Sequence, residues 1–316
     1  MIDGALPYLR CPVCRQPLER VDRTLRCPLR HSFDMAKQGY ADLTAGRMPH
    51  VGDTAAMIAD RDAFLTAGHY DFIADALAAA TGPGFTIDAL AAATGPGFTI
   101  DAPATEAGPG SVVDAPATEA EPGSVVDAPT AGSGPGFVID AGTGTGHYLF
   151  RVLDALPGAT GLGLDVSKPA LRRAARAHPR AAAVLTDLWR PLPIADGVAD
   201  VVLNVFSPRN GPEFHRVLRP DGLLLVVTPQ PDHLRELIAT HEMIQVDPDK
   251  AARVQESLGD HFKSGAPIPL RREMTLTAAE TRTLIGMTPS AHHAPAIDAA
   301  PATVTASVLL TPYRPL

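Results

Sequence analysis

The feature that most constrains the fold is a short apolar run that leads into three glycines, FVIDAGTGTG, at residues 137–146. The run predicts a buried strand, and Gly142, Gly144 and Gly146 predict a turn whose bare backbone can approach a ligand closely. Residues 147–156 then carry apolar side chains at helical spacing. A strand, a glycine turn and a helix in this order are typical of the first unit of an α/β fold that binds a nucleotide-like ligand.

Two carboxylates near this turn bear on the class of ligand. Asp140 ends the strand, and Asp165 ends a second apolar run about twenty residues beyond the turn, where this topology has a ribose-binding acid. Diphosphates usually lie on a G-x-G-x-x-G turn, whereas this chain has G-x-G-x-G with an acid just before it. Asp140 would repel a diphosphate and suits a cation, such as the amino or sulfonium group of S-adenosylmethionine. We therefore favour a methyltransferase over a nicotinamide-dependent oxidoreductase.

Further apolar runs supply the rest of a sheet. One leads to Asp187, one ends at Asn204, and two more occur at 223–227 and 302–313. These six runs predict an α/β fold with a Rossmann-like sheet, and the methyltransferase interpretation implies the seven-stranded core of the class I S-adenosylmethionine-dependent methyltransferases. Ligands of such sheets bind at the carboxyl ends of the strands. We expect Asp187 to contact the adenine amine, with a helix N-cap as its alternative role. The predicted donor-binding residues at this point are Asp140, Gly142, Gly144, Gly146, Asp165, Asp187 and Asn204.

The three cysteines all lie in the first tenth of the chain, at Cys11, Cys14 and Cys27. CPVC supplies a C-x2-C pair, and CPLRH adds His31 at C-x3-H spacing. Three sulfur ligands and one nitrogen ligand match a closed, structural zinc site, with residues 15–26 forming a hairpin between the two pairs. Unrelated cysteines or a redox-active C-x2-C pair are the alternatives.

A 13-residue repeat occupies residues 82–146, where five copies follow one another without a gap. The fifth copy, GPGFVIDAGTGTG, contains the glycine turn, whereas the first four have LAA or PAT or PTA in place of its glycines. We therefore expect the first four copies, residues 82–133, to be an exposed expansion that is poorly ordered or weakly strand-like. Added edge strands or a binding arm are the alternative.

The charge and hydropathy of the chain exclude some classes of protein. A net charge of −8 argues against nucleic-acid binding through a broad basic surface, although residues 1–50 carry eight Arg and Lys against five acids. The sequence has no apolar run long enough to span a membrane and no secretory signal at its start. We therefore expect no membrane partner and a cytoplasmic location.

With these parts in view, the chain resembles the RlmA family of 23S rRNA (guanine-N1)-methyltransferases, which includes macrolide (tylosin) resistance members. The similarity covers nearly the whole chain except the repeat. The stretches that carry it are CPVCRQPL and CPLRHSFDMAKQGYADL, GDTAAMIADRDAFLTAGHYDFI, VIDAGTGTGHY, GLDVSKPALRRAARAHP and FSPRNGPEFHRVLRPDGLLLVVTPQPDHLREL.

The resemblance implies methyl transfer from S-adenosylmethionine to N1 of a guanine in hairpin 35 of 23S rRNA. It also implies an RNA-gripping zinc domain and a homodimer. Its cofactor contacts map onto Tyr70, Gly144, Thr145 and His233; the alternatives are a core aromatic for Tyr70 and a surface position for His233. The chain departs from the family at Thr143 and Thr145, where members usually carry an acid or a cysteine. The implied domains are a zinc domain at 1–46, a helical linker at 47–81, the repeat at 82–133 and the methyltransferase domain at 134–316.

The catalytic residues are the least constrained part of the prediction. Asn204, Arg209 and Asn210 occur where a substrate base would enter, and Arg209 could stabilise O6 of guanine. No residue pattern identifies a general base. Two other functions are compatible with the sequence, namely a small-molecule methyltransferase with a zinc appendage and an inactive zinc- and RNA-binding homologue.

Overall fold

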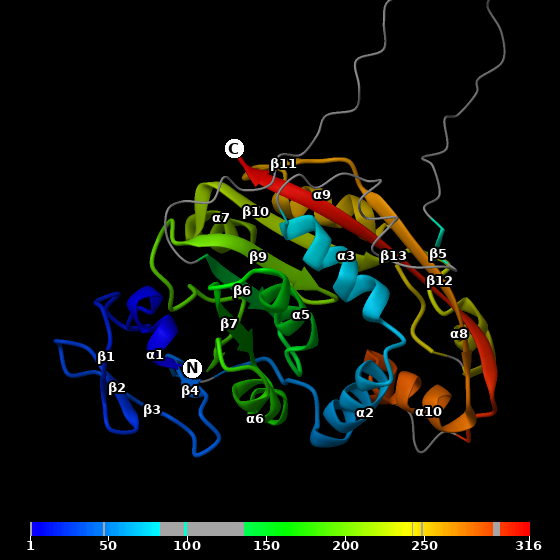
Figure 1. The fold of residues 1–316 in the computed structure, drawn as a ribbon, viewed down its shortest axis with the longest axis horizontal. Coiled ribbons are helices and arrows are strands. Elements are labelled where there is room, and N and C mark those ends of the chain that lie inside the picture. Colours follow the sequence, from blue (N-terminus) through cyan, green and yellow to red (C-terminus); the bar gives the residue numbers. More distant parts are fainter. Residues whose placement is uncertain are drawn as a thin grey trace, which may run out of the picture.

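A computed structural model describes residues 2–46, 48–82, 98–99, 136–241, 243–247, 249–292 and 298–316 (Figure 1). A ten-stranded sheet crosses the molecule, and β11 (Phe262–Ser264) pairs with one of its central strands, β13. The other strands lie in the spatial order β4 (Ala41–Asp42), β8 (Ala181–Leu185), β7 (Thr160–Asp165), β6 (Phe137–Ala141), β9 (Ala199–Val205), β10 (Leu218–Pro229), β13 (Ala302–Pro315), β12 (Ile268–Leu276) and β5 (Phe98–Thr99).

The topology confirms the predicted core. Neighbouring strands from β4 to β10 are parallel, while β13 is antiparallel to both β10 and β12. The seven strands from β8 to β12 form the expected sheet, and β4, β5 and β11 are additions. Strand β7 pairs with β6 on one side, and β9, which comes later in the chain, pairs with β6 on the other side. This reversal creates the switch point at which ligands of open α/β sheets bind.

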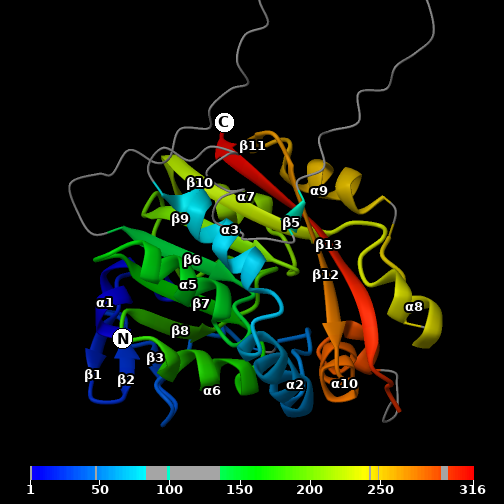
Figure 2. The ribbon, with the colours of Figure 1, turned by 45° about the vertical axis from the view of Figure 1, so that its right-hand side comes forward.

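Alternate residues of the strands enter two separate cores, as the pleat requires. Val138 of β6 packs in one core, whereas Phe137 and Ile139 pack in the other. The first face is covered by α3 (Asp71–Thr81), α5 (His147–Ala155) and α6 (Lys168–Ala177), which lie in front of the sheet in Figure 2. The opposite face is covered by α1 (Ile2–Ala5), α7 (Gly211–Val217) and α9 (Lys250–Leu258).

Three of the remaining helices, α2 (Ala55–Thr66), α8 (Arg235–His241) and α10 (Ala278–Gly286), pack in the first core. The 3-10 helix η1 (Leu6–Tyr8) packs against the opposite core, where Tyr8 stacks on Phe137, and the 3-10 helix η2 (Pro289–His292) follows α10. The Thr54 hydroxyl accepts a hydrogen bond from Met57 N at the start of α2. Thr277 and Glu280 form a reciprocal capping box at the start of α10.

The N-terminal domain folds as a small three-stranded antiparallel sheet of β1 (Glu19–Val21), β2 (Thr24–Arg26) and β3 (Ser32–Asp34). The predicted hairpin between the cysteine pairs is thereby confirmed. The domain is also joined to the large sheet, because β4 pairs with β8 through Ala41 and Val184. This places β4, which belongs to the predicted segment 1–46, at the edge of the methyltransferase sheet.

The predicted repeat expansion, residues 82–133, lies outside the described residues apart from Gly82 and β5. Within the second copy, β5 pairs antiparallel with β12 at the sheet edge, with Thr99 opposite Arg271. Sequence reasoning did not predict β12, which separates β5 from β13.

Candidate functional site

The predicted zinc ligands converge at the base of the N-terminal domain. The ligand atoms of Cys11, Cys14, Cys27 and His31 all lie within 4.8 Å of one another. His31 Nδ1 lies 3.3 Å from Cys27 Sγ and 3.6 Å from Cys11 Sγ, and Cys14 Sγ lies 3.6 Å from Cys27 Sγ. These separations are those of atoms on the corners of a tetrahedron about one zinc ion, with zinc–ligand distances of about 2.0–2.3 Å.

The local backbone and the thiol chemistry both suit a metal. Each cysteine knuckle closes through an arginine in the left-handed region, Arg15 with φ 63° and Arg30 with φ 64°. Burial acts to raise the pKa of the Cys27 thiol, but hydrogen bonds from the His31 backbone and the neighbouring ligand side chains outweigh burial and lower this pKa to about 7. A thiol that ionises near neutral pH is readily converted to the thiolate that zinc requires.

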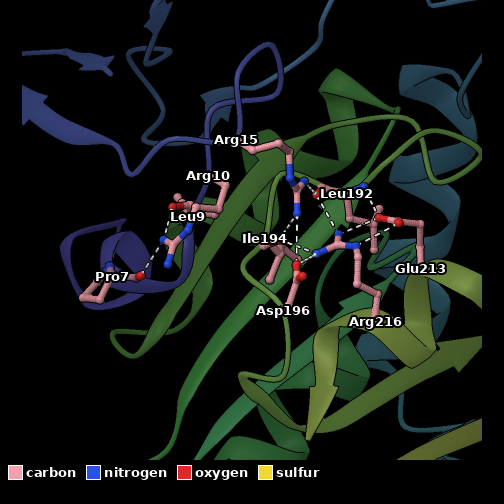
Figure 3. Close-up of polar contacts among 9 residues, drawn as sticks. All are labelled: Pro7, Leu9, Arg10, Arg15, Leu192, Ile194, Asp196, Glu213 and Arg216. Atoms are coloured by element: carbon pink, nitrogen blue, oxygen red, sulfur yellow. Dashed lines mark hydrogen bonds and ion pairs between the residues drawn. The ribbon is translucent and has the colours of Figure 1, made fainter. Parts of the chain in front are cut away.

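A polar network fastens this zinc domain to the large sheet (Figure 3). Arg15 donates to the carbonyl oxygens of Leu192 at 2.6 Å and Ile194 at 2.8 Å. Arg216 of α7 donates to the same two carbonyls and also lies 2.6 Å from Glu213. The residue that closes the first zinc knuckle therefore bonds directly to the loop between β8 and β9.

The glycine turn has the geometry that the sequence predicts. Gly142, Gly144 and Gly146 all have positive φ, at 88°, 54° and 91°. A Cβ atom at Gly142 would lie 2.4 Å from the side chain of Ser207, so no other residue fits there without movement. Thr145, between the last two glycines, is only 6% exposed. The backbone of Gly142 therefore packs directly against Ser207, just beyond the end of β9.

Two acids beside the turn, the buried Asp140 and the partly buried Asp165, hold it in place. Asp140, which is 1% exposed, accepts a hydrogen bond of 2.8 Å from the Thr143 hydroxyl. Asp165 accepts backbone hydrogen bonds from Gly144 N at 2.8 Å and Ser167 N at 2.7 Å. Burial raises the pKa of Asp140 to about 7, the Thr143 hydrogen bond opposes this shift, and the charge of Asp165 adds to it. A cation bound beside Asp140 would restore its ionised form.

Asp187 lies just beyond β8 and is 3% exposed. Its carboxylate accepts from Trp189 N at 3.0 Å and contacts His50 Nδ1 at 2.8 Å. No helix begins at this residue, so Asp187 is not the N-cap that the alternative interpretation required. The His50 imidazole lies where a ligand amine that bonded to this carboxylate would have to bind.

Tyr70 and His233 come together although 163 positions separate them in the chain. Tyr70 Oη lies 3.4 Å from His233 Nε2. Because Ser307 N donates to His233 Nδ1 at 3.1 Å, the ring proton is assigned to Nε2, which donates to the tyrosine. Burial lowers the pKa of His233 to about 4, so this ring is neutral at physiological pH. Tyr70 also packs edge-on against Phe64 and is 2% exposed, as its alternative role of a core aromatic requires, while its contact with the cofactor stays a prediction.

The three catalytic candidates have different surroundings. Asn204 is fully buried, and its amide donates to Ser207 Oγ and Pro208 O at 2.8 Å each. Asn210 caps α7, because its side chain accepts from Glu213 N and donates to the carbonyl of Leu188. The hydrogen bonds of Asn204 and Asn210 therefore hold the neighbouring loops and the start of α7 in place. Arg209 is half-buried, and burial lowers its pKa.

Sequence reasoning missed Arg61 of α2, which reaches over the glycine turn. Its Nη1 lies 2.6 Å from Asp53 and would lie 3.3 Å from a Cβ atom at Gly144. Nη2 donates to the carbonyl of Met287 at 3.1 Å. Helix α2 of the linker therefore brings a cation next to Gly144 of the turn. No local sequence pattern predicts this placement.

Comparisons with known proteins agree with this geometry. A zinc-ribbon family model described as "RlmA, N-terminal" matches residues 9–45, and a model described as "Methyltransferase domain" matches residues 138–222. A relative from Micromonospora griseorubida, whose name places it among the 23S rRNA (guanine-N(1)-)-methyltransferases, is 50% identical over 98% of both chains. The chain belongs to the RlmA-type 23S rRNA (guanine-N1)-methyltransferase family. The 23S rRNA (guanine(748)-N(1))-methyltransferase of Streptomyces fradiae, another member, is 41% identical over 100% of both chains.

Membership of this family accounts for both parts of the site. The RlmA-type zinc ribbon, matched over residues 9–45, contains the four-ligand cluster, and the methyltransferase domain, matched over residues 138–222, contains the glycine turn. Within the described residues, no helix is long and apolar enough to cross a membrane.

Proposed function

We propose that this chain transfers a methyl group from S-adenosylmethionine to N1 of a guanine in hairpin 35 of 23S rRNA. The observation that carries the proposal is that a four-ligand zinc cluster and a glycine turn flanked by acids occur in one structure, in which Arg15 joins the zinc ribbon to the loop between β8 and β9. The 41% identity to the guanine(748) enzyme supports the same nucleotide as the target. Macrolide resistance and homodimer formation are further parts of this proposal.

The donor site supplies a group of suitable charge for each end of the cofactor. Asp140 is suited to the cationic amino or sulfonium group, and Arg61 to the carboxylate of the methionine moiety. Asp165, whose carboxylate already orders the turn, lies where the ribose hydroxyls are expected. Asp187 would bind the adenine amine after His50 gives up its contact with this carboxylate. Tyr70 and His233 are proposed to close the site.

S-adenosylmethionine supplies an electrophilic methyl group. When bound, it would pass this methyl group to guanine N1 as the carbon–sulfur bond breaks and S-adenosylhomocysteine leaves, and the N1 proton would go to solvent or to a base. Holding the two reactants in line contributes more than any acid or base that the site displays. Arg209 is proposed to face guanine O6, where negative charge develops as N1 loses its proton. Asn204 and Asn210 are better explained as residues that hold the surrounding loops.

The zinc ribbon is proposed to bind phosphates and so to position the RNA. Arg23, Arg26 and Arg30 are exposed on it, close to the zinc ligands in sequence. Phosphate contacts of this kind set register and orientation, while the target base must leave its stack to reach the donor. The small-molecule alternative gives no role to this basic module. The inactive-homologue alternative is disfavoured because the turn and the acids beside it are intact.

The first four repeat copies, residues 82–133, are proposed to be dispensable. The fifth copy alone provides β6 and the glycine turn. A chain that lacks residues 82–133 should therefore bind S-adenosylmethionine and methylate RNA as the full chain does, and loss of donor binding in calorimetry would contradict this.

The proposed function is tested by incubating zinc-loaded protein with labelled S-adenosylmethionine and unmodified 23S rRNA. We expect label in the RNA and one stop to reverse transcription at a guanine of hairpin 35, whose Watson–Crick edge the methyl group blocks. Premethylated rRNA serves as the matched control and should take up no label. Label in no RNA, or calorimetry that shows uptake of NADH but not of S-adenosylmethionine, would overturn the proposal. Sedimentation and tylosin susceptibility of an expressing host test the dimer and the resistance.

A further inference from the structure

Phe206 is in a conformation that large side chains avoid. It follows β9 directly and has φ 51°, in the left-handed region that favours glycine. The ring is also 42% exposed, although an aromatic side chain gains most from burial. Strained backbone of this kind persists where neighbouring structure enforces it, and it is concentrated at functional sites.

The structure holds Phe206 in place from both sides. Its own N–H donates to the carbonyl of Val227 at 3.1 Å. The Asn204 amide bonds to Ser207 Oγ and Pro208 O at 2.8 Å each, and the Ser207 hydroxyl donates to the carbonyl of Ala141. The turn after β9 is therefore fixed to β6 and β10 while the ring at its tip stays open.

The ring lies beside two of the expected cofactor contacts. Its centroid is 6.3 Å from the Tyr70 ring and 6.0 Å from the His233 ring. The next residue, Ser207, packs so closely on the glycine turn that a Cβ atom at Gly142 would lie 2.4 Å from it. Phe206 thus occupies the switch point between β6 and β9, beside the place where a methyl donor would lie.

We propose that Phe206 is the platform on which the target guanine stacks after it leaves the RNA helix. An aromatic face suits this ligand because an extruded base exposes its own π-face and is commonly held by stacking in methyltransferases and RNA-binding proteins. Stacking would orient the base, and it leaves N1 free to meet the methyl group. The inference rests on the proposed function and names a residue that contacts the substrate.

The test compares Phe206→Ala, Phe206→Leu and Phe206→Tyr, with 23S rRNA as substrate and Leu316→Ala as the control at another exposed apolar position. Loss of base–aromatic stacking predicts that kcat/KM falls about 5- to 150-fold in the Ala and Leu variants. The Tyr variant should retain most activity, and the control should equal the wild type. Calorimetry should show unchanged affinity for S-adenosylmethionine in all four.

Phe206→Gly separates the ring from the backbone, because glycine adopts this φ without strain. It should be at least as stable as the wild type and as impaired as Phe206→Ala. Wild-type activity in the Ala, Leu and Gly variants would overturn the stacking role while leaving the proposed function intact. Weakened donor binding in these variants would also overturn it, because the ring would then serve the cofactor. A wild-type chain that methylates no RNA would instead refute the proposed function.

Discussion

The two arginines that share the carbonyls of Leu192 and Ile194 should differ sharply in their effect on stability. Arg15 of the zinc knuckle and Arg216 of α7 each donate to both carbonyls, and each approaches Asp196, at 3.4 Å and 2.6 Å. Their charges repel each other, and both burial and Arg216 lower the pKa of Arg15. Removing one arginine therefore leaves the carbonyls satisfied by the other.

The magnitudes follow from what each substitution leaves behind. Arg15→Ala leaves no acceptor unpaired and relieves the repulsion, so it should lower the free energy of unfolding by only about 1–2 kcal/mol. Arg216→Ala removes both contacts to Glu213, at 2.9 Å and 2.6 Å, from a carboxylate whose side chain is 16% exposed. An uncompensated buried charge of this kind costs about 3–5 kcal/mol. We expect about 3 kcal/mol here because Leu192 N still donates to Glu213.

Urea unfolding of the zinc-loaded chain measures the difference in unfolding free energy between the two variants. The transition is monitored by circular dichroism and by the fluorescence of Trp189, the one tryptophan, which lies in the loop between β8 and β9. Arg10→Ala is the matched control, because the hydrogen bonds of the Arg10 guanidinium to the described residues go to Pro7 O and Leu9 O of its own segment (Figure 3). It should cost well under about 1 kcal/mol. An Arg15→Ala loss equal to or greater than that of Arg216→Ala would refute the reasoning.

Three other perturbations have defined outcomes. Gly142→Ala puts a Cβ atom 2.4 Å from Ser207 at φ 88°, so it should lower the unfolding free energy by about 1–3 kcal/mol and weaken donor binding; unchanged urea and calorimetry midpoints would contradict this. Burial raises the pKa of Asp140 to about 7, so the carboxyl of the donor-free protein is protonated below that pH. The affinity for the cationic donor should therefore fall about tenfold per pH unit below pH 7 and level off above it. Asp140→Asn should flatten this profile in calorimetry, and an equally steep profile in the variant would exclude Asp140 as the titrating group. Removing the metal with a chelator, or replacing Cys27 with Ser, should abolish zinc in atomic absorption and lower the melting temperature, because Cys11 and Leu9 are buried in the same core as the sheet. An unchanged melting temperature of the zinc-free chain would show that the ribbon does not stabilise the core.

Local signals determined which parts of the fold could be predicted. The zinc cluster and the glycine turn are short and demand particular residue types, so their spacing alone identified them. Strand β12 was missed because Arg271, Arg272 and Glu273 interrupt its apolar pattern. Its alternate residues nevertheless face the core, and Arg272 is accommodated over the ring of Phe72, 5.7 Å from its centroid.

The features that could not be predicted all depend on partners distant in sequence. Arg15 meets Leu192 across 177 positions, and His50 meets Asp187 across 137. Neither member of these pairs has a distinctive local pattern, because an exposed arginine or histidine has the same sequence surroundings as a docked one. The left-handed conformation of Phe206 is likewise imposed by tertiary contacts, since nothing in VFSP favours positive φ at phenylalanine. Sequence motifs therefore located the zinc-ligand cluster and the glycine turn, whereas the fold determines how the ribbon is attached and how the Phe206 ring is held.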